Sequence, residues 1–316
     1  MRITKNGSLI FPSFLTALNM AVDEISKTST WLAAIRPKTL WAAVAPVLIG
    51  VAMAIEAGVV HWLAAALALT GALFIQIGTN FFNDYADFKK GADTDDRKGP
   101  LRVTQAGLVS PQGMKNATFL VFGLAIIAGS YLMWRGGWPI VVIGVLSIIS
   151  GFMYTAGKYS LAYLGLGDIF VLIFFGPVAV GGTYFVQALA IENTVLIAGM
   201  APGLLAVAIL LVNNIRDVAE DRLAGKKTIV VRFGRTFGLA CYFVCMVVTG
   251  LIPIILYVIT GKHPAVLLAS ASMLIGLYLF SKVVKTPPSP ALNPILGATA
   301  RLLLIYSIVF SITWNL

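Results

Sequence analysis

The sequence predicts an all-α membrane protein, and its composition and its long apolar runs are the two observations that lead to this fold class. Apolar residues make up 59% of the 316 residues and charged residues only 11%. Typical soluble domains hold about 45–50% apolar and about 25% charged residues. A soluble protein of this length needs a charged surface, which this chain lacks. Lipid is therefore the expected solvent.

The apolar residues fall in continuous runs rather than in short alternating segments. A helix needs about 17–25 apolar residues to cross ~30 Å of hydrocarbon, whereas a strand of a membrane barrel alternates over about ten residues. The runs therefore predict about nine transmembrane helices. They cover residues 40–58, 62–83, 117–134, 139–156, 165–187, 194–213, 238–260, 264–282 and 297–315.

Charge is distributed unevenly over the connections between these spans. The net charge is +10, yet of the 23 Lys and Arg residues only Arg135 and Lys262 lie on one side if the spans alternate across the membrane. Such a bias marks the basic side as cytoplasmic, so the N-terminus is predicted to be cytoplasmic. Membrane topology and attraction to anionic lipid explain the excess of basic residues, so nucleic acid is not an expected partner.

Residues 1–30 are predicted to be an N-terminal tail or start extension. The apolar stretch 9–22 is broken by Pro12 and Asn19, and no small-residue cleavage site follows it. Residues 31–316 are expected to form a single transmembrane domain. The expected partners are membrane lipid and small-molecule substrates, without an obligate protein partner.

Carboxylates concentrate in two long connections on the basic side, residues 84–116 and 214–237. A carboxylate at the centre of a helix in lipid costs about 2.5–3.5 kcal/mol on insertion scales. Acids that begin inside apolar helices are therefore expected to face a polar cavity. The two connections hold eight of the 13 acidic residues, namely Asp84, Asp87, Asp93, Asp95, Asp96, Asp217, Glu220 and Asp221.

Each cluster shows a helical spacing of four. Asn83 and Asp87 share one helix face, and Asn213, Asp217 and Asp221 form a second stripe. The motifs lie four spans apart, which suggests two similar four-helix halves with a ninth helix added. Oxygen ligands without His or Cys favour a hard cation such as Mg²⁺. The candidate Mg²⁺ ligands are Asn83, Asp84, Asp87, Asp93, Asn213, Asp217 and Asp221.

Basic residues accompany both stripes. If each stripe holds one Mg²⁺ ion, a diphosphate can bridge the two ions, and nearby cations can neutralise the remaining phosphate charge. For Asp95, Asp96 and Glu220, which lie off the stripes, the alternative is salt bridging within the loop. The candidate diphosphate-binding residues are Arg97, Arg102, Arg216, Arg222, Lys226 and Lys227.

The two motifs together resemble those of the UbiA superfamily of intramembrane prenyltransferases. The first reads N-D-x-x-D-x-x-x-G-x-D from Asn83, and the second reads N-N-x-R-D-x-x-x-D-R-x-x-G-K-x-T-x-x-V-R-x-G from Asn213. Within the superfamily, the chain is most similar to the branch that prenylates 1,4-dihydroxy-2-naphthoate. Further matching stretches follow in the expected order at residues 36–40, 99–102, 105–107, 154–158, 163–168 and 174–176.

The resemblance implies nine helices around a central cavity, capped on the cytoplasmic side by the loops that carry the motifs. It implies transfer of a polyprenyl group from polyprenyl diphosphate to 1,4-dihydroxy-2-naphthoate with decarboxylation, which gives demethylmenaquinol for menaquinone biosynthesis. Mg²⁺, as two ions, would stabilise the leaving diphosphate. The expected location is the cytoplasmic (inner) membrane of a bacterium, with the active-site loops on the cytoplasmic side.

The resemblance also assigns a catalytic set. Tyr154 and Lys158 match the superfamily's Y-x-x-x-K motif, whose expected role is contact with the diphosphate. Together with Asp87 and Asp217 they form the predicted catalytic residues. For Tyr154 the alternative is an aromatic residue of the membrane interface, and for Lys158 it is a juxtamembrane anchor.

Three residues are candidates for binding the acceptor. Arg36 and Lys38, just before the first span, are suited to the acceptor carboxylate, and Asp168 in the G-L-G-D stretch can shape the acceptor end. Juxtamembrane anchoring for the two cations and a helix N-cap for Asp168 are the alternatives. The sequence names no catalytic base.

Two other functions remain open. The first is transfer to 4-hydroxybenzoate or another aromatic acceptor by the same chemistry. The second is a cation-coupled membrane transporter, because intramembrane carboxylates also mark ion paths. Transporter sites usually lie near the midplane on broken helices. Here the acids lie at helix ends beside Arg and Lys, which favours a phosphate ligand.

Overall fold

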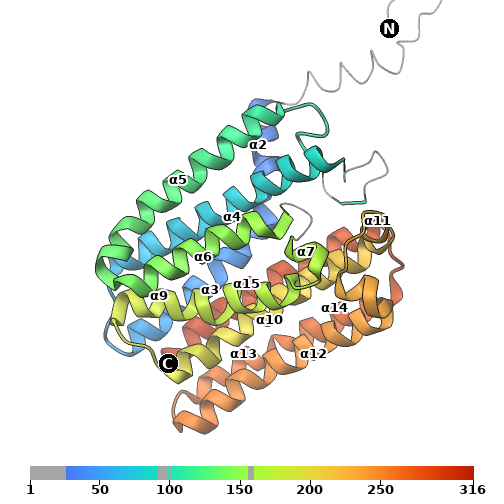
Figure 1. Ribbon diagram of the computed structural model, residues 1–316. Helices are drawn as coiled ribbons and strands as arrows, with labels where there is room; N and C mark the ends of the chain where they lie inside the picture. The colour runs from blue at the N-terminus through green and yellow to red at the C-terminus, as the bar shows by residue number, and fades with distance from the viewer. Residues whose placement is uncertain (1–25, 92–97, 100, 156–159) are drawn as a thin grey trace, which may run out of the picture.

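The computed structural model describes residues 26–91, 98–99, 101–155 and 160–316, and these residues form helices without any strand (Figure 1). The elements in chain order are α2 (Lys27–Ile35), α3 (Pro37–Glu56), α4 (Trp62–Lys90), α5 (Pro111–Gly136), α6 (Trp138–Thr155), α7 (Leu161–Leu164), α8 (Gly167–Ile173), η1 (Phe174–Val178), α9 (Ala179–Ala188), α10 (Asn193–Arg216), α11 (Val218–Leu223), α12 (Ile229–Thr260), η2 (Pro264–Val266), α13 (Leu267–Ala271), α14 (Met273–Lys285), η3 (Pro290–Leu292) and α15 (Asn293–Trp314).

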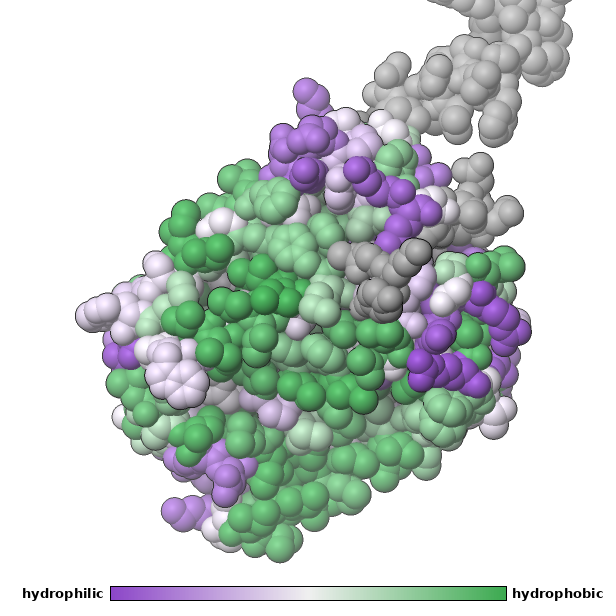
Figure 2. Space-filling model, viewed as in Figure 1, coloured by the Kyte–Doolittle hydropathy of each residue, from purple (hydrophilic) through white to green (hydrophobic). Residues whose placement is uncertain are grey.

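In the described part of the chain, nine helical segments are long and apolar enough to cross a membrane, which confirms the predicted fold class. The chain is an integral, multi-pass membrane protein. Figure 2 shows apolar side chains over the middle of one face and hydrophilic side chains toward its two ends, including the end that carries α2 and α11. The molecule therefore has the surface that lipid requires.

The helices that carry the motifs are longer than the apolar runs that predicted them. The helix α4 continues to Lys90 instead of ending at residue 83, and α10 continues to Arg216 instead of 213. The element α12 begins at Ile229 rather than at 238, and it is kinked at Gly234, whose φ of 85° and ψ of 168° are not helical. Hydropathy ends a span at its first polar residues, whereas the helical hydrogen bonds of α4 and α10 continue through those residues. Both motifs therefore begin on rigid helix ends rather than in loops.

The helix α10 lies at the centre of the bundle. Its most apolar window is 67% buried, against 17% for α6, and it packs against α12, α15 and η1. A Cβ atom added to Gly203 would lie 2.5 Å from the carbonyl oxygen of Leu172. The backbones of α8 and α10 are thus in direct contact, as small residues permit in membrane proteins. This contact fixes α8 relative to the helix that carries the second motif.

The helix α2 packs against α4, the helix that carries the first motif. Ser26 caps its first turn, and Trp31 packs on Phe81 of α4 with ring centroids 5.5 Å apart. Asn80 donates hydrogen bonds to the Ile35 carbonyl and to Thr39, which joins the start of α3 to α4. Of the predicted tail at residues 1–30, the last four residues belong to α2, and residues 1–25 lie outside the described residues.

Candidate functional site

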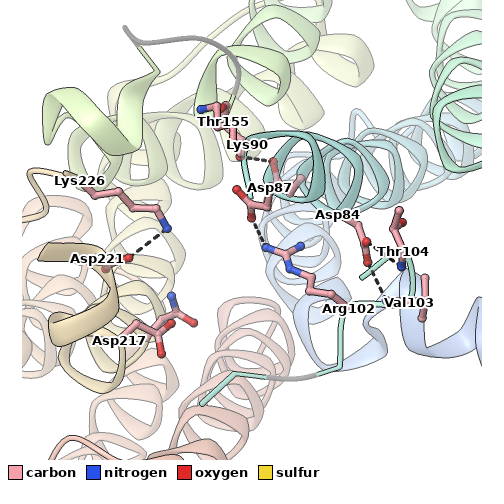
Figure 3. Close-up of polar contacts among 12 residues, drawn as sticks. Asp84, Asp87, Lys90, Arg102, Val103, Thr104, Thr155, Asp217, Asp221 and Lys226 are labelled. Carbon is pink, nitrogen blue, oxygen red and sulfur yellow. Dashed lines mark hydrogen bonds and ion pairs between the residues drawn. The ribbon is translucent and has the colours of Figure 1, made fainter. Parts of the chain in front are cut away.

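A cavity of about 910 Å³ takes in both motifs. The ends of α4 and α10 reach it from two sides, as Figure 3 shows for Asp87 on one side and Asp217 and Asp221 on the other. Away from this polar end the wall is mostly apolar and comes from α4, α5, α6 and α9. The polar end is lined by Asn83, Asp87, Arg102, Asn213, Arg216, Asp217, Asp221 and Lys226.

The first motif places one carboxylate on the cavity wall. Asp87 is 6% exposed and forms a buried ion pair with Arg102, which follows it by 15 residues (Figure 3). The side-chain amide oxygen of Asn83 accepts a hydrogen bond of 2.5 Å from the Thr155 hydroxyl, and Lys90 donates to the Thr155 backbone carbonyl. The last two turns of α4 are therefore held against the end of α6.

The structure corrects the predicted role of Asp84. Its carboxylate is 1% exposed and accepts the backbone N–H groups of Val103 and Thr104, each at 3.2 Å. Because Asp84 follows Asn83 by one residue, its side chain points about 100° around the helix from the stripe. Figure 3 shows it directed away from Asp217, and it does not line the cavity. This placement argues against Mg²⁺ ligation; Asp84 instead holds the segment that carries Arg102.

The second motif is organised by one guanidinium group. Arg216 is 1% exposed and donates to both carboxylate oxygens of Asp217 at 2.6 Å. It also donates to the side-chain oxygens of Asn213 and Asn293, each at 2.6 Å. Such a bidentate pair fixes geometry as well as charge. Arg216, predicted to bind diphosphate, is thus already engaged by three side chains and orients Asp217 and Asn213 at the cavity wall.

Lys226 and Asp221 form the second cation–carboxylate pair at the wall, 3.0 Å apart (Figure 3). Burial raises the pKa of the Asp221 carboxyl above its ordinary value, and Lys226 opposes part of that shift. Burial works to lower the pKa of Lys226, but the carboxylates of Asp221 and Asp87 outweigh it, so that its pKa is raised. Lys226 therefore keeps a full positive charge between the two motifs.

Not every predicted phosphate ligand reaches the cavity. Arg222 and Lys227 are exposed and do not line it. Each is adjacent in sequence to a residue that does line it, and neighbouring side chains leave the backbone in different directions. Their predicted role in diphosphate binding is therefore corrected. Asp93, Arg97 and Lys158 lie outside the described residues.

The acceptor candidates lie in the same cavity. Arg36, Lys38 and Asp168 all line it, as does Tyr154. Asp168 is 6% exposed and stands in the first turn of α8. The Tyr154 ring lies beside the start of α8, 3.4 Å from where a Cβ atom of residue 167 would stand.

The G-L-G-D stretch is shaped by contact with the second motif's loop. Gly165 has φ of 73°, and a Cβ atom there would lie 2.2 Å from the Lys227 carbonyl oxygen. Arg232 donates to the Leu164 carbonyl at 2.6 Å. Only glycine fits both the left-handed backbone and this close approach. The turn before Asp168 and the loop after Asp221 therefore form one unit.

Two residues that hold the site were missed by the sequence analysis. Asn293, at the start of α15, bonds Arg216 and the Lys98 carbonyl, and Thr155 bonds Asn83. Thr155 lies within a matching stretch, whereas a single Asn before a proline carries no distinguishing pattern. Glu220 also lines the cavity and lies 3.7 Å from Lys98, in the salt bridge that was its alternative.

The donor set fits Mg²⁺ held jointly with a phosphate ligand. Among the described residues, no group of three or more His, Cys, Asp and Glu side chains forms a closed metal site. The cavity instead presents a few carboxylate and amide oxygens from each of two walls. Mg²⁺ commonly takes one or two carboxylates and completes its shell with water and phosphate oxygens. The geometry suits that mode better than a protein cage.

Comparison with known proteins yields consistent matches along the chain. The model of the UbiA prenyltransferase family matches residues 43–306. The 1,4-dihydroxy-2-naphthoate octaprenyltransferase of Escherichia coli is 36% identical over 300 residues, which is 92% of this chain and 96% of that protein. The protein of the same description from Haemophilus influenzae is 34% identical, over 90% of this chain and 96% of its own.

The fold also has a close counterpart among solved structures. A UbiA homolog from Archaeoglobus fulgidus, bound to GPP and Mg²⁺, superposes with a TM-score of 0.65. The match covers 90% of this chain and 100% of that one, at 16% sequence identity. At this identity the likeness establishes the helical architecture alone.

Proposed function

The chain belongs to the UbiA prenyltransferase family, and on that premise we propose that it transfers a polyprenyl group from polyprenyl diphosphate to 1,4-dihydroxy-2-naphthoate. The carboxyl group is lost in the reaction, and the product is demethylmenaquinol. The description of the relatives supports the choice of acceptor. The observation that carries the chemistry is a single cavity with carboxylate-bearing helix ends on two of its walls.

Five oxygen-bearing side chains are proposed to hold Mg²⁺. They are Asn83 and Asp87 on one wall and Asn213, Asp217 and Asp221 on the other. The division into two walls supports two ions. When bound, Mg²⁺ supplies charge stabilisation to the leaving diphosphate.

The cations of the cavity are proposed to bind the diphosphate. Arg102 and Lys226 line the wall and neutralise Asp87 and Asp221. They thus lie where charge develops as the allylic C–O bond breaks, and groups so placed favour the transition state over the ground state. Tyr154 is proposed to donate a hydrogen bond from its hydroxyl to the same diphosphate, and Lys158 is proposed to bind the diphosphate too.

The apolar part of the cavity is proposed to hold the polyprenyl tail and the acceptor ring. Exclusion of water there protects the allylic cation. Arg36 and Lys38 are proposed to face the acceptor carboxylate, since both line the cavity and carry the opposite charge. The ring is then held between these cations and the diphosphate.

We infer a bacterial cytoplasmic membrane as the location, with α11 on the cytoplasmic side and the N-terminus on that side too. The bacterial relatives and the excess of Lys and Arg at the motif end support this orientation. Maleimide labelling of single cysteines in intact cells tests it: Leu223→Cys, exposed on α11, should label only after the membrane is opened.

The decisive experiment uses the purified protein in detergent with Mg²⁺ and a polyprenyl diphosphate. Parallel assays offer 1,4-dihydroxy-2-naphthoate or 4-hydroxybenzoate. We expect a decarboxylated prenyl-naphthoquinol from the first acceptor and none from the second, and EDTA should abolish the reaction reversibly. Product from 4-hydroxybenzoate alone would keep the chemistry and reject the acceptor. Folded protein that gives no product with either acceptor would reject the proposal.

A further inference from the structure

One buried carboxyl group in the cavity has no partner in the metal and diphosphate chemistry. Asp168 is 6% exposed and lines the cavity. Its Oδ1 atom is buried and has no hydrogen-bond partner among the described residues. Leaving a buried polar atom without a hydrogen bond costs about 1–3 kcal/mol. An unpaired oxygen on a residue that lines a cavity therefore indicates that a ligand group binds to this residue.

The residues around Asp168 indicate which of the two substrates it contacts. Phe170 and Phe174 line the cavity close by in sequence, with nearly parallel rings 6.0 Å apart. Flat aromatic ligands stack on such rings. The Tyr154 ring also lies beside this turn, 3.4 Å from where a Cβ atom of residue 167 would stand. Asp168 therefore has aromatic rings near it on which a flat acceptor ring can stack.

Charge decides which group of the acceptor Asp168 can meet. A carboxylate repels the acceptor carboxylate, which is better matched by Arg36 and Lys38. What remains on the ring is a hydroxyl group, and a carboxylate accepts the hydroxyl proton in a short charge-assisted hydrogen bond. A helix-cap role does not account for Asp168, because α8 has no side-chain cap and Oδ1 has no partner among the described residues.

We propose that Asp168 is the general base of the reaction: it takes the proton of the acceptor hydroxyl next to the carboxylate-bearing ring carbon and later returns it. This inference rests on the proposed function. A base placed at the developing phenolate typically contributes about 10²–10⁴-fold to the rate. It also supplies the base that the sequence analysis did not find.

The proton balance closes without any added reagent. As the hydroxyl proton moves to Asp168, the O–H electron pair forms a C=O bond, and the adjacent ring carbon bonds the allylic carbon. The allylic C–O bond breaks, and its electrons leave with the diphosphate. The new ketone lies beta to the carboxylate, so carbon dioxide leaves and its electron pair restores the ring as an enolate. The enolate oxygen recovers the proton from Asp168.

Another titratable group lies near Asp168 and must be separated from it in the test. Tyr154 on α6 lines the same cavity, and its ring lies against Gly167, next to Asp168. The Asp168→Asn variant removes the base and keeps the shape of the side chain. The matched control is Glu192→Gln, the same chemical change at a carboxylate outside the cavity whose partner, Tyr184, still finds an acceptor.

The test measures kcat/KM for 1,4-dihydroxy-2-naphthoate over a pH series, for wild type and both variants. We expect Asp168→Asn to lose about 10² or more of kcat/KM near neutral pH and to regain activity as hydroxide replaces the base. Hydrolysis of the polyprenyl diphosphate without acceptor should be unchanged, and Glu192→Gln should behave as wild type. Wild-type kcat/KM in Asp168→Asn, or equal loss of diphosphate hydrolysis, would overturn the inference.

A second readout needs no turnover. Bound 1-hydroxy-2-naphthoate should show the red-shifted absorption of a naphthol that donates to a carboxylate, and the shift should disappear in Asp168→Asn. An identical spectrum in both proteins would overturn the inference even if prenyl transfer occurs. A shift that depends on Asp168 in a protein without transfer activity would instead reject the proposed function and keep the hydroxyl-binding role.

Discussion

The two motif-bearing helix ends present similar residues to one cavity, but they are held in place by different means. At the end of α4, the carboxylate of Asp87 is paired with Arg102, which comes from a separate segment. At the end of α10, Arg216 follows Asn213 on the same helix and clamps the neighbouring Asp217. The first wall is paired with a residue that follows it by 15 positions. The second combines a clamp within its own helix end with a bond to Asn293, 77 positions away.

The loops that follow the two helices differ in the same way. Asp84 fastens the first through two backbone N–H groups. The second rests against Gly165, whose missing side chain allows contact with the Lys227 carbonyl. A repeated ligand spacing therefore does not imply a repeated support, because each helix end faces different neighbours. Variants that weaken one wall and not the other can measure this difference.

The largest effect is expected from the carboxylates themselves. Asp87→Asn and Asp217→Asn should each lower kcat by about 10³-fold, because each removes a ligand from a charge-stabilising site. Prenyl-product formation under saturating Mg²⁺ measures this. Equal loss in both would show that the two walls share one reaction. Near-normal activity in either would exclude that wall from metal binding.

The second-largest effect is expected from the cationic side chains of the cavity. Arg102→Met and Lys226→Met should each cost about 10²-fold in kcat, and Arg222→Met, exposed and outside the cavity, is the matched control. Both variants should also unfold at a lower temperature than wild type, since Arg102→Met leaves Asp87, and Lys226→Met leaves Asp221, buried and unpaired. Detergent thermal melts beside the assay measure both effects. Activity loss in Arg222→Met would contradict the assignment of Arg222 to the surface.

A smaller effect is expected at Asp84. The Asp84→Asn side chain offers one acceptor oxygen to two backbone N–H groups, so the unfolding free energy should fall by about 1–3 kcal/mol. Activity should fall about tenfold through misplacement of Arg102, while the affinity for Mg²⁺ stays unchanged. Titration of activity with Mg²⁺ checks this distinction. A weakened Mg²⁺ affinity would restore Asp84 to the predicted ligands.

The smallest effect is expected at Arg232, which lies on the surface and joins the second loop to Leu164. Arg232→Met removes one exposed hydrogen bond, worth about 0.5–1.5 kcal/mol, so kcat should drop only a few-fold. Melting temperature and prenyl transfer are again the measurements. A loss as large as that of Asp84→Asn would mean that the second wall depends on distant support as strongly as the first does.

Much of the site followed from spacing alone. Asn83 with Asp87, and Asn213 with Asp217 and Asp221, were placed on common helix faces because an α-helix repeats every 3.6 residues, and all five line the cavity. Asp84 lies about 100° around the helix from Asn83 but only about 60° from Asp87, so spacing did not reveal that its carboxylate bonds Val103 and Thr104. Spacing also did not reveal that Arg222 and Lys227 are exposed, because net charge near a motif does not determine side-chain direction.

The sequence by itself determined the membrane fold class and the nine spans, since lipid demands long apolar helices whatever their neighbours are. It also determined which carboxylates share a face, since that is a local property of the helix. Only the tertiary structure decided which partners those faces meet: Arg102 for Asp87, Asn293 for Arg216, and the Lys227 carbonyl for Gly165. These contacts join residues far apart in the chain, and no local spacing specifies which distant segment arrives.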